Sequence, residues 1–152
     1  STTALFTVKS IAEKSNITLI TNSIEILLEI PQKNDWRIIS TGGEFVRNGL
    51  SFAGRQAESV IDEYNVDLAV ISCKGFDMRK GITDTRDYNA QIKKAFIRSA
   101  KKVYLAVDNT KFDQTSFVRF AEIADIDAVV TDTEPSDEWK SYLSGNNVEL
   151  YF

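Results

Sequence analysis

Five short apolar runs, each followed directly by a small polar or acidic cluster, constrain the fold of this chain more than any other feature. The runs are rich in β-branched residues and too short for helices, which is typical of strands buried on both faces of a parallel sheet. In an open α/β sheet, ligands bind in the crevice outside the carboxyl ends of the strands. The polar clusters therefore lie where a ligand is expected. The five runs occupy residues 19–20, 38–39, 68–71, 103–107 and 128–130.

Between these runs, apolar residues recur at helical spacing, so helices and strands alternate along the chain. Ser23 is expected to cap the second helix and Pro31 to stop it. The alternation predicts an α/β fold with a mostly parallel open sheet and helices on both faces, Rossmann-like, with right-handed connections. The expected helices cover residues 3–14, 24–30, 54–64, 87–101 and 135–143, and a last strand is expected at 148–151.

Residues 44–53 interrupt this alternation. Asn48-Gly49 lies there between two short apolar stretches, and Asn-Gly is the strongest two-residue signal for a hairpin, because both central positions of a type I′ turn need positive φ. We therefore expect an inserted β-hairpin after the second strand. Its apolar residues are more than a free two-stranded projection would carry, so they are also a candidate surface for self-association. They are Phe45, Val46, Leu50 and Phe52.

The composition excludes several classes of function. The chain has 152 residues, enough for one domain with its own core, and no histidine, which removes Ser-His-Asp and Cys-His catalysis and His-liganded zinc. Its one cysteine fits a reducing, cytoplasmic setting. No apolar stretch approaches the roughly 20 residues that span a bilayer, so no membrane partner is expected. Because the net charge is −4, these residues alone are a poor DNA-binding surface.

Nucleotide-binding motifs are also absent from the sequence, and we expect neither a cofactor nor a metal. The strand-end clusters instead combine hydroxyls, amides, glycines and carboxylates, which suit a small and phosphorylated ligand. Each cluster alone is explained about as well by ordinary turns and helix caps. The candidate effector-binding residues are Thr2, Thr3, Thr21, Asn22, Ser23, Gly42, Gly43, Gly75, Asp77, Gly81, Thr83, Lys93, Asp108 and Lys111.

These candidates have different expected roles. The hydroxyls and the amide near two helix starts, Thr2-Thr3 and Thr21-Asn22-Ser23, are expected to cradle a phosphate, and Lys111 would add a positive charge. Residues 75–84 are expected to form a long functional loop, because they are too many for a tight turn. The loop is expected to recognise the sugar part of a ligand. Within this loop, Asp77 and Thr83 would contact sugar hydroxyls, and Gly75 and Gly81 would provide its bends.

The first residues, Ser1-Thr2-Thr3, open a helix with no strand before it, although later helices of the core have one. We expect the chain to begin in the middle of a βα unit and to lack its first strand. The alternative is a true N-terminus that carries a good helix cap.

In their order and spacing, the motifs of this chain resemble the C-terminal sensor domain of DeoR/GlpR-type bacterial transcriptional repressors. The resemblance runs from Ser1 to Asp132. Two positions depart from the family pattern: Ser1 stands where glycine is usual, and Asn89 where a glutamate is common. The motifs are Ser1-Thr2-Thr3, Thr21-Asn22-Ser23, Thr41-Gly42-Gly43, Ser51-Phe52-Ala53-Gly54, Asp67-Leu68-Ala69, Gly75-Phe76-Asp77, Gly81-Ile82-Thr83, Ile92-Lys93-Lys94-Ala95, Asp108-Asn109-Thr110-Lys111-Phe112 and Val130-Thr131-Asp132.

The resemblance implies a fold similar to ribose-5-phosphate isomerase and a phosphorylated sugar or related metabolite as effector. It also implies an N-terminal winged helix-turn-helix that binds operator DNA. That segment is absent from these 152 residues, so operator DNA would be a partner only through it. Because such repressors read two half-sites, we expect the sensor domain to form a homodimer or homotetramer.

Two other functions share the fold. One is a sugar-phosphate isomerase, in which Asp77 or Asp84 with Lys93 would move the proton, although the catalytic motifs of that enzyme are not intact here. The other is a bare oligomerisation module whose strand-end clusters are only structural. Fold alone cannot choose among the three. The sequence favours a non-enzymatic effector sensor.

Overall fold

The structure is a computed structural model that describes residues 2–30 and 35–152, with side chains from Leu5 onward. The chain divides into two compact units, Ser1–Tyr64 and Asn65–Phe152, and each is described by itself. The expected helix stop at Pro31 lies outside the described residues. No helix in the described part of the chain has the length and hydropathy of a membrane-crossing segment.

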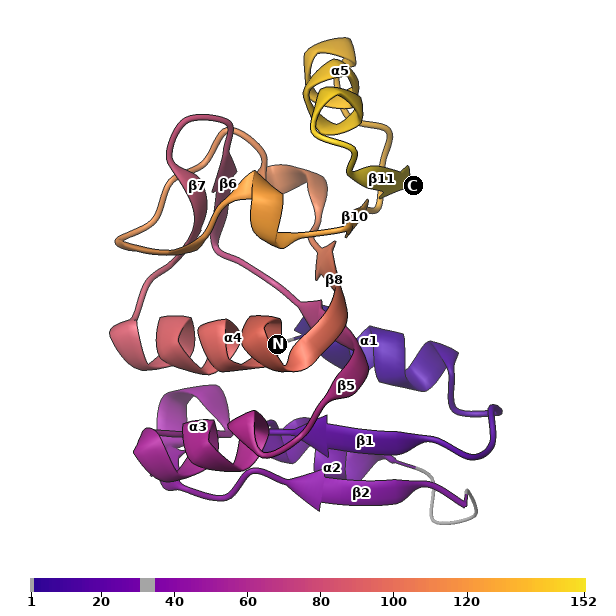
Figure 1. The fold of residues 1–152 in the computed structure, drawn as a ribbon, viewed down its shortest axis with the longest axis vertical. Coiled ribbons are helices and arrows are strands. Elements are labelled where there is room, and N and C mark those ends of the chain that lie inside the picture. The colour runs from indigo at the N-terminus through magenta and orange to yellow at the C-terminus, as the bar shows by residue number, and fades with distance from the viewer. Residues whose placement is uncertain (1, 31–34) are drawn as a thin grey trace. The chain divides into compact units, whose positions relative to one another are not determined.

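The first unit contains a parallel strand pair, an antiparallel hairpin and three α-helices (Figure 1). Its core is formed by Val8, Ile26, Ile30 and Trp36. In order along the chain, the elements are α1 (Thr2–Ser10), β1 (Thr18–Thr21), α2 (Ile24–Glu29), β2 (Arg37–Ser40), β3 (Glu44–Val46), the 3-10 turn η1 (Arg47–Gly49), β4 (Ser51–Ala53) and α3 (Arg55–Asp62).

The second unit contains a four-stranded parallel sheet in the order β11-β10-β8-β5 and a three-stranded antiparallel sheet in the order β6-β7-β9. Figure 1 shows the β6–β7 hairpin standing beside the end of the parallel sheet. The elements are β5 (Val66–Ile71), β6 (Gly75–Asp77), β7 (Gly81–Asp84), α4 (Asp87–Ser99), β8 (Ala100–Ala106), η2 (Asn109–Lys111), β9 (Val118–Ala121), η3 (Ile123–Asp125), β10 (Ala128–Val130), α5 (Asp137–Gly145) and β11 (Glu149–Tyr151).

The core of this second unit joins the two sheets to the helices. Leu105 and Val129 are fully buried on adjacent parallel strands. Phe76 from the hairpin packs on Trp139 of α5, with ring centroids 4.6 Å apart. The indole N–H of Trp139 donates a 3.0 Å hydrogen bond to Asp113, so the one polar atom of this buried ring is satisfied. The hairpin and α5 are therefore parts of one core.

The predicted alternation of strands and helices is confirmed. Each of the five apolar runs lies in or overlaps a strand, and the strand pairs among them are parallel. Ser23 caps α2 as expected, because its hydroxyl oxygen accepts a hydrogen bond from the backbone N–H of Ile26. The fourth helix ends at Ser99, two residues before its expected end, because β8 begins at once with Ala100 opposite Val66.

The hairpin at residues 44–53 is also confirmed, with Phe45 opposite Phe52, but its turn differs from the prediction. The connection is a 3-10 turn, and Leu50, rather than Asn48 or Gly49, has positive φ (41°). The type I′ assignment was therefore wrong. The connection between the two strands is longer than a two-residue type I′ turn because it contains the 3-10 turn. Asn48 and Gly49 therefore do not need left-handed backbone.

Two further expectations were wrong. Residues 75–84 do not form a loop but the paired strands β6 and β7, with Phe76 opposite Ile82. The strand β9, which extends this sheet through Ile82–Ala121 pairing, was not predicted at all. Glycines and charges in the turn concealed the alternation in this hairpin, and residues 118–121 mix arginine with apolar residues in a segment too short for a clear pattern.

The two glycines after β2 offer a matched test of backbone packing. Both have positive φ, but a Cβ on Gly43 would lie 2.6 Å from the carbonyl oxygen of Ala53, whereas a Cβ on Gly42 would meet nothing within 4 Å. We expect Gly42→Ala to lower the free energy of unfolding by about 1 kcal/mol through left-handed strain alone. Gly43→Ala should cost about 2–4 kcal/mol, because the overpacking adds to the strain. Urea unfolding measures both, and equal losses would contradict the close approach.

Candidate functional site

Three parallel strands of the second unit end at one edge of the sheet. In the register, Ile71 of β5 lies opposite Leu105, and Ala106 of β8 lies opposite Val130 of β10. The segments that follow them are therefore neighbours. The backbone N–H of Asn109 donates a 2.8 Å hydrogen bond to the carboxylate of Asp132, which links the segment after β8 to the segment after β10.

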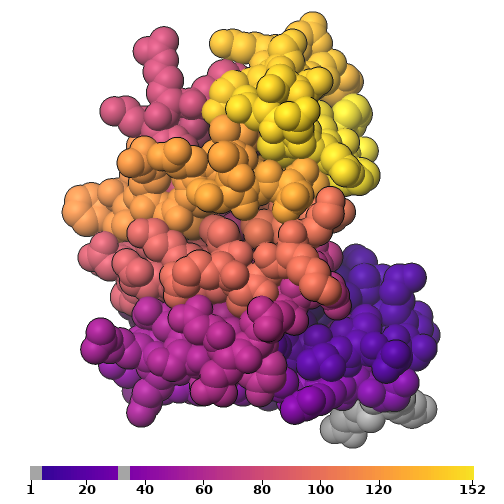
Figure 2. All heavy atoms as spheres, in the orientation of Figure 1, coloured from indigo at the N-terminus to yellow at the C-terminus, as the bar shows by residue number. Residues whose placement is uncertain are grey.

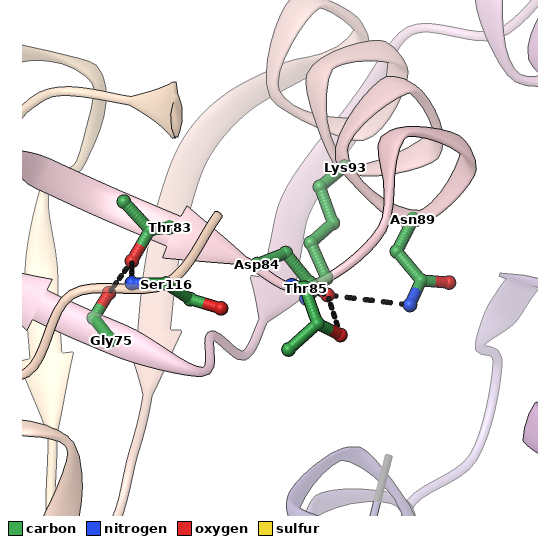
Figure 3. A network of polar contacts seen from close by, with 7 residues as sticks. All are labelled: Gly75, Thr83, Asp84, Thr85, Asn89, Lys93 and Ser116. Atoms are coloured by element: carbon green, nitrogen blue, oxygen red, sulfur yellow. Dashed lines mark hydrogen bonds and ion pairs between the residues drawn. The ribbon is translucent and has the colours of Figure 1, made fainter. Parts of the chain in front are cut away.

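A buried ion pair lies beside this edge. Asp84, the last residue of β7, is 1% exposed, and its Oδ2 forms a salt bridge with Nζ of Lys93 on α4 (Figure 3). The other oxygen, Oδ1, accepts hydrogen bonds from the backbone N–H of Thr85 at 2.7 Å and from the side-chain amide of Asn89 at 3.3 Å. Lys93 also lies 5.1 Å from the centre of the Phe120 ring. Both charges are thus held by several fixed contacts.

These contacts determine the protonation state of Asp84. Burial by itself would raise the pKa of its carboxyl, but the charge and hydrogen bond of Lys93, with the hydrogen bonds of Thr85 and Asn89, outweigh burial and hold the pKa below its usual value. At neutral pH the carboxylate is therefore charged and paired. A carboxylate stabilised in this way is a poor base.

The single cysteine shows which charges gather at the edge. Cys73 follows β5 and is buried, and burial raises the pKa of its thiol to about 12, against the opposing effect of the Lys93 and Lys111 charges. The thiol stays protonated at neutral pH, so it is not a nucleophile. Backbone contacts link the elements that carry these charges, because the N–H of Lys74 donates to the carbonyl of Thr83 at 2.9 Å, and Phe76 of β6 forms a β-bridge with Phe112, the residue after η2.

The turn after β8 holds Lys111 at the surface. The Asp108 carboxylate accepts hydrogen bonds from the hydroxyl and the backbone N–H of Thr110, and the hydroxyl bond is the first cause of its lowered pKa. Nζ of Lys111 lies 3.3 Å from the same carboxylate and donates a hydrogen bond to the Thr110 hydroxyl. A partly exposed pair of this kind is weak, so an incoming anion can compete for the lysine.

Asp77 and Thr83, which were expected to contact sugar hydroxyls, have other partners. The hydroxyl of Thr83 donates to the carbonyl of Gly75 at 3.2 Å and accepts from the backbone N–H of Ser116 at 2.8 Å. The Asp77 carboxylate accepts from the N–H groups of Lys80 and Arg79, in that order the main causes of its lowered pKa. Figure 3 shows the Thr83 contacts and the Asp84 contacts as two separate groups.

The glycines of this hairpin lie where bends and close packing need them. Gly81 begins β7 with φ +77°, and Gly75 begins β6 as a buried residue. The expected bend is thus present at Gly81. Gly75 instead lets the chain pass close to Gln114, since a Cβ there would lie 2.5 Å from the Gln114 carbonyl oxygen.

The remaining candidates lie in the first unit. The hydroxyl of Thr21 accepts from the N–H of Ser23 at 3.1 Å, and the amide of Asn22 donates to the carbonyl of Phe52 at 2.9 Å. The N–H of Thr41 donates to the carbonyl of Thr21, which brings the start of the Gly42-Gly43 segment beside the end of β1. Thr2 and Thr3 begin α1, and their side chains are not described.

The structure thus brings together only part of the predicted set, because Gly75, Asp77, Gly81 and Thr83 belong to the β6–β7 hairpin. The strand-end cluster of the second unit contains Lys93, Asp108 and Lys111 from the prediction, and it adds Asp84, Asn89 and Asp132, which the predicted effector set omitted. The sequence signal for Asp132 is the same as for Asp108, because each lies in a polar cluster that follows an apolar run. Within the described residues, no group of three or more Cys, Asp or Glu side chains is arranged to hold a metal.

This geometry defines the class of protein: it is an α/β domain with a polar cluster at the carboxyl edge of its parallel sheet. A family model described as DeoR C terminal sensor domain matches residues 1–133. The HTH-type transcriptional regulator YulB of Bacillus subtilis (strain 168) is 35% identical over 133 residues, which cover 88% of this chain and 51% of that protein. The chain belongs to the DeoR C-terminal sensor domain family, so the resemblance seen in its motifs is confirmed.

Two further relatives have names that describe their roles. The transcriptional repressor AccR of Agrobacterium fabrum is 33% identical over 87% of this chain and 52% of that protein. The glycerol-3-phosphate regulon repressor of Escherichia coli is 26% identical over 90% of this chain and 54% of that protein. The chain therefore spans about half the length of the curated relatives it matches.

The Asp84–Lys93 pair gives a test of the site's electrostatics. Lys93→Met should lower the free energy of unfolding at neutral pH by about 3–5 kcal/mol, because it leaves a buried carboxylate without its partner. The pKa of Asp84 is lowered in the folded protein, so the pair stabilises the fold above the unfolded pKa near 3.9, and this contribution is lost as the pH falls through the folded pKa. The difference between wild type and variant should therefore shrink in acid.

Urea unfolding at several pH values measures this difference. Lys101→Met is the matched control, because Lys101 forms an exposed pair with Asp67 and should lose little stability at any pH. The double variant Asp84→Asn/Lys93→Met should lose less than the sum of the two single variants. A loss that does not depend on pH, or strictly additive losses, would show that the two charges are not coupled.

Proposed function

We propose that this chain is the effector-sensing domain of a sugar-metabolism transcriptional repressor and that its effector is a phosphorylated sugar. The observation that carries the proposal is the set of charged residues beside the carboxyl edge of the sheet, with the Asp84–Lys93 pair at the end of β7 and Lys111 in the turn after β8, in a chain that belongs to the DeoR sensor family. Ligands of open α/β sheets bind at this edge. A site with both lysines and a carboxylate can recognise a phosphate and hydroxyl groups together.

The side chains divide these tasks. Lys111 is held only by partly exposed partners, so its ammonium can turn to a phosphate. Asp84 would offer a carboxylate oxygen to the hydroxyl groups of a bound sugar, and Asn89 would offer its side-chain amide. Lys93 fixes the carboxylate in place. The polar set of the first unit, with Thr21, Asn22 and Ser23, remains a separate prediction of phosphate contacts.

We further propose that the 152 residues are the sensor part of a longer regulator. The match to about half of each relative supports this proposal, and the Bacillus subtilis relative YulB carries HTH-type in its name. Operator DNA would then be bound by a helix-turn-helix outside this chain, and effector binding would control it. Such a regulator acts in the cytoplasm, where its operator lies. The name of the Escherichia coli relative, a glycerol-3-phosphate regulon repressor, supports a phosphorylated metabolite as the kind of effector.

No observation favours the isomerase alternative. An isomerase needs a carboxylate that accepts a carbon-bound proton, and the carboxylate of Asp84 is instead occupied by Lys93, Thr85 and Asn89, with a lowered pKa. The relatives named above are transcriptional regulators and repressors. These facts support a sensor without catalysis.

The phosphate contact can be tested at Lys111. A charge-assisted bond to an anion contributes about 1.5–3 kcal/mol, so Lys111→Ala should weaken binding of a sugar phosphate by roughly tenfold or more. Calorimetric titration with hexose and triose phosphates, and with the unphosphorylated sugars, measures this loss. Lys101→Ala, at the opposite end of β8, is the control and should leave the affinity unchanged. Equal affinity for sugar and sugar phosphate would rule out the phosphate contact.

Self-association is a second proposal, because two operator half-sites require at least a dimer. The hairpin of the first unit exposes two apolar side chains, Phe45 at 51% and Leu50 at 43%. Light scattering should give a mass at least twice 17.1 kDa, and Phe45→Asp should lower it. Phe117→Asp, which changes an exposed phenylalanine of the other unit, should not. A wild-type monomer at high micromolar concentration would refute association through this domain.

A further inference from the structure

The second unit carries a basic hollow that the proposed effector site does not use. It has a volume of about 390 Å³, and it is lined by three cationic side chains, three hydroxyls and an aromatic ring. Figure 2 shows side chains of the β6–β7 turn projecting from the surface of this unit. The residues that define the basic hollow are Arg79, Lys80, Thr83, Thr115, Ser116, Phe117 and Arg119.

The walls of the basic hollow are fixed by hydrogen bonds rather than left to flexible loops. The β6–β7 turn is closed by Asp77, whose carboxylate accepts from the N–H groups of Arg79 and Lys80 at 2.8 and 2.7 Å. The opposite wall is tied to β7, because the N–H of Ser116 donates to the Thr83 hydroxyl at 2.8 Å. Arg119 lies on β9 opposite Thr83. These hydrogen bonds fix the backbone from which the cationic side chains extend.

The charge of the basic hollow is positive, although the chain as a whole carries −4. Arg79 and Lys80 are exposed and form no salt bridge with any described residue, while Arg119 pairs with Glu122 at 3.1 Å. Both members of that pair are more than half exposed, so an anion can compete with Glu122. Asp77 is a further carboxylate beside the turn, and one of its oxygens is engaged in the turn. Three cations line the basic hollow, and none of its lining residues is acidic.

We propose that the basic hollow is a second binding site, for a phosphate monoester that carries an apolar or aromatic group. Arginine is suited to two parallel hydrogen bonds to a phosphate, and the hydroxyls of Thr115 and Ser116 can supply further donors. Phe117 is 86% exposed at the rim of the hollow, where its ring can cover the non-phosphate part of the ligand. The volume is that of an ordinary small-molecule site.

This second site is separate from the strand-end cluster. Thr83, which lines the basic hollow, and Asp84, which belongs to the ion pair, are successive residues of β7 and make their contacts in two different groups (Figure 3). Successive residues of a strand point to opposite faces of the sheet. Ligands in the two sites would therefore contact opposite faces of one strand, and occupancy of one site need not displace a ligand from the other.

The test uses phenyl phosphate and inorganic phosphate as probes and the Lys111→Ala chain as background, so that the strand-end phosphate contact is already removed. Arg79→Ala and Arg119→Ala should each weaken phenyl phosphate by roughly three- to tenfold in calorimetric titration. Phe117→Ala should weaken phenyl phosphate and leave inorganic phosphate unchanged. Lys102→Ala, an exposed lysine of β8, is the control and should change neither.

Arg79, Lys102, Phe117 and Arg119 are exposed, so their variants should fold, and circular dichroism checks this for each variant. Amide NMR signals of residues 115–119 should shift on titration with phenyl phosphate. The proposal is overturned if phenyl phosphate does not bind at millimolar concentration, or if it binds with equal affinity to the arginine variants and to the control. Neither result bears on the sugar-phosphate site, because that site is tested by Lys111→Ala in the otherwise wild-type chain.

Discussion

The buried ion pair between Asp84 and Lys93 is the interaction on which the candidate site depends. It joins the end of a strand to the middle of a helix, and two further hydrogen bonds and an aromatic ring surround it. Buried pairs of this kind often add little net stability, since the cost of removing two charges from water is large. Their value lies in geometry, because a carboxylate that must stay paired is held in one position. A sensor needs such a fixed acceptor to distinguish one arrangement of hydroxyls from another.

The alternation of side chains along β7 divides the second unit into two surfaces. Asp84 faces the helix and the strand-end cluster, whereas Thr83 ties the hairpin to the segment before β9. A single strand can thus support an effector site and an independent anion site. The two proposed sites are compatible with a net charge of −4, because an anion site needs cations only at a few positions.

Much of the parallel framework could be predicted from the sequence, because β-branched runs, Ser23 and the residues that follow each strand report local structure. The antiparallel sheet could not, since the pairing of β7 with β9 depends on contacts between residues almost forty positions apart. Lys111 and Asp108 were predicted as effector-binding residues because they follow an apolar run, whereas Asp84 was considered only as a catalytic group of the isomerase alternative. Asp77 and Thr83 were selected as polar residues near glycines, and their polar groups hold the turn and the sheet together. Sequence reports which groups are available, and only the fold reports which of them already have partners.

The central claim is that a phosphorylated sugar binds at the carboxyl edge of the parallel sheet in the second unit. The most direct measurement is an NMR titration of the isotopically labelled chain with a panel of hexose and triose phosphates. At least one compound should give saturable shifts concentrated in residues 72–75, 84–93, 108–111 and 131–132, and the corresponding unphosphorylated sugar should not. Saturable shifts confined to other residues, or none with any compound of the panel, would contradict the claim.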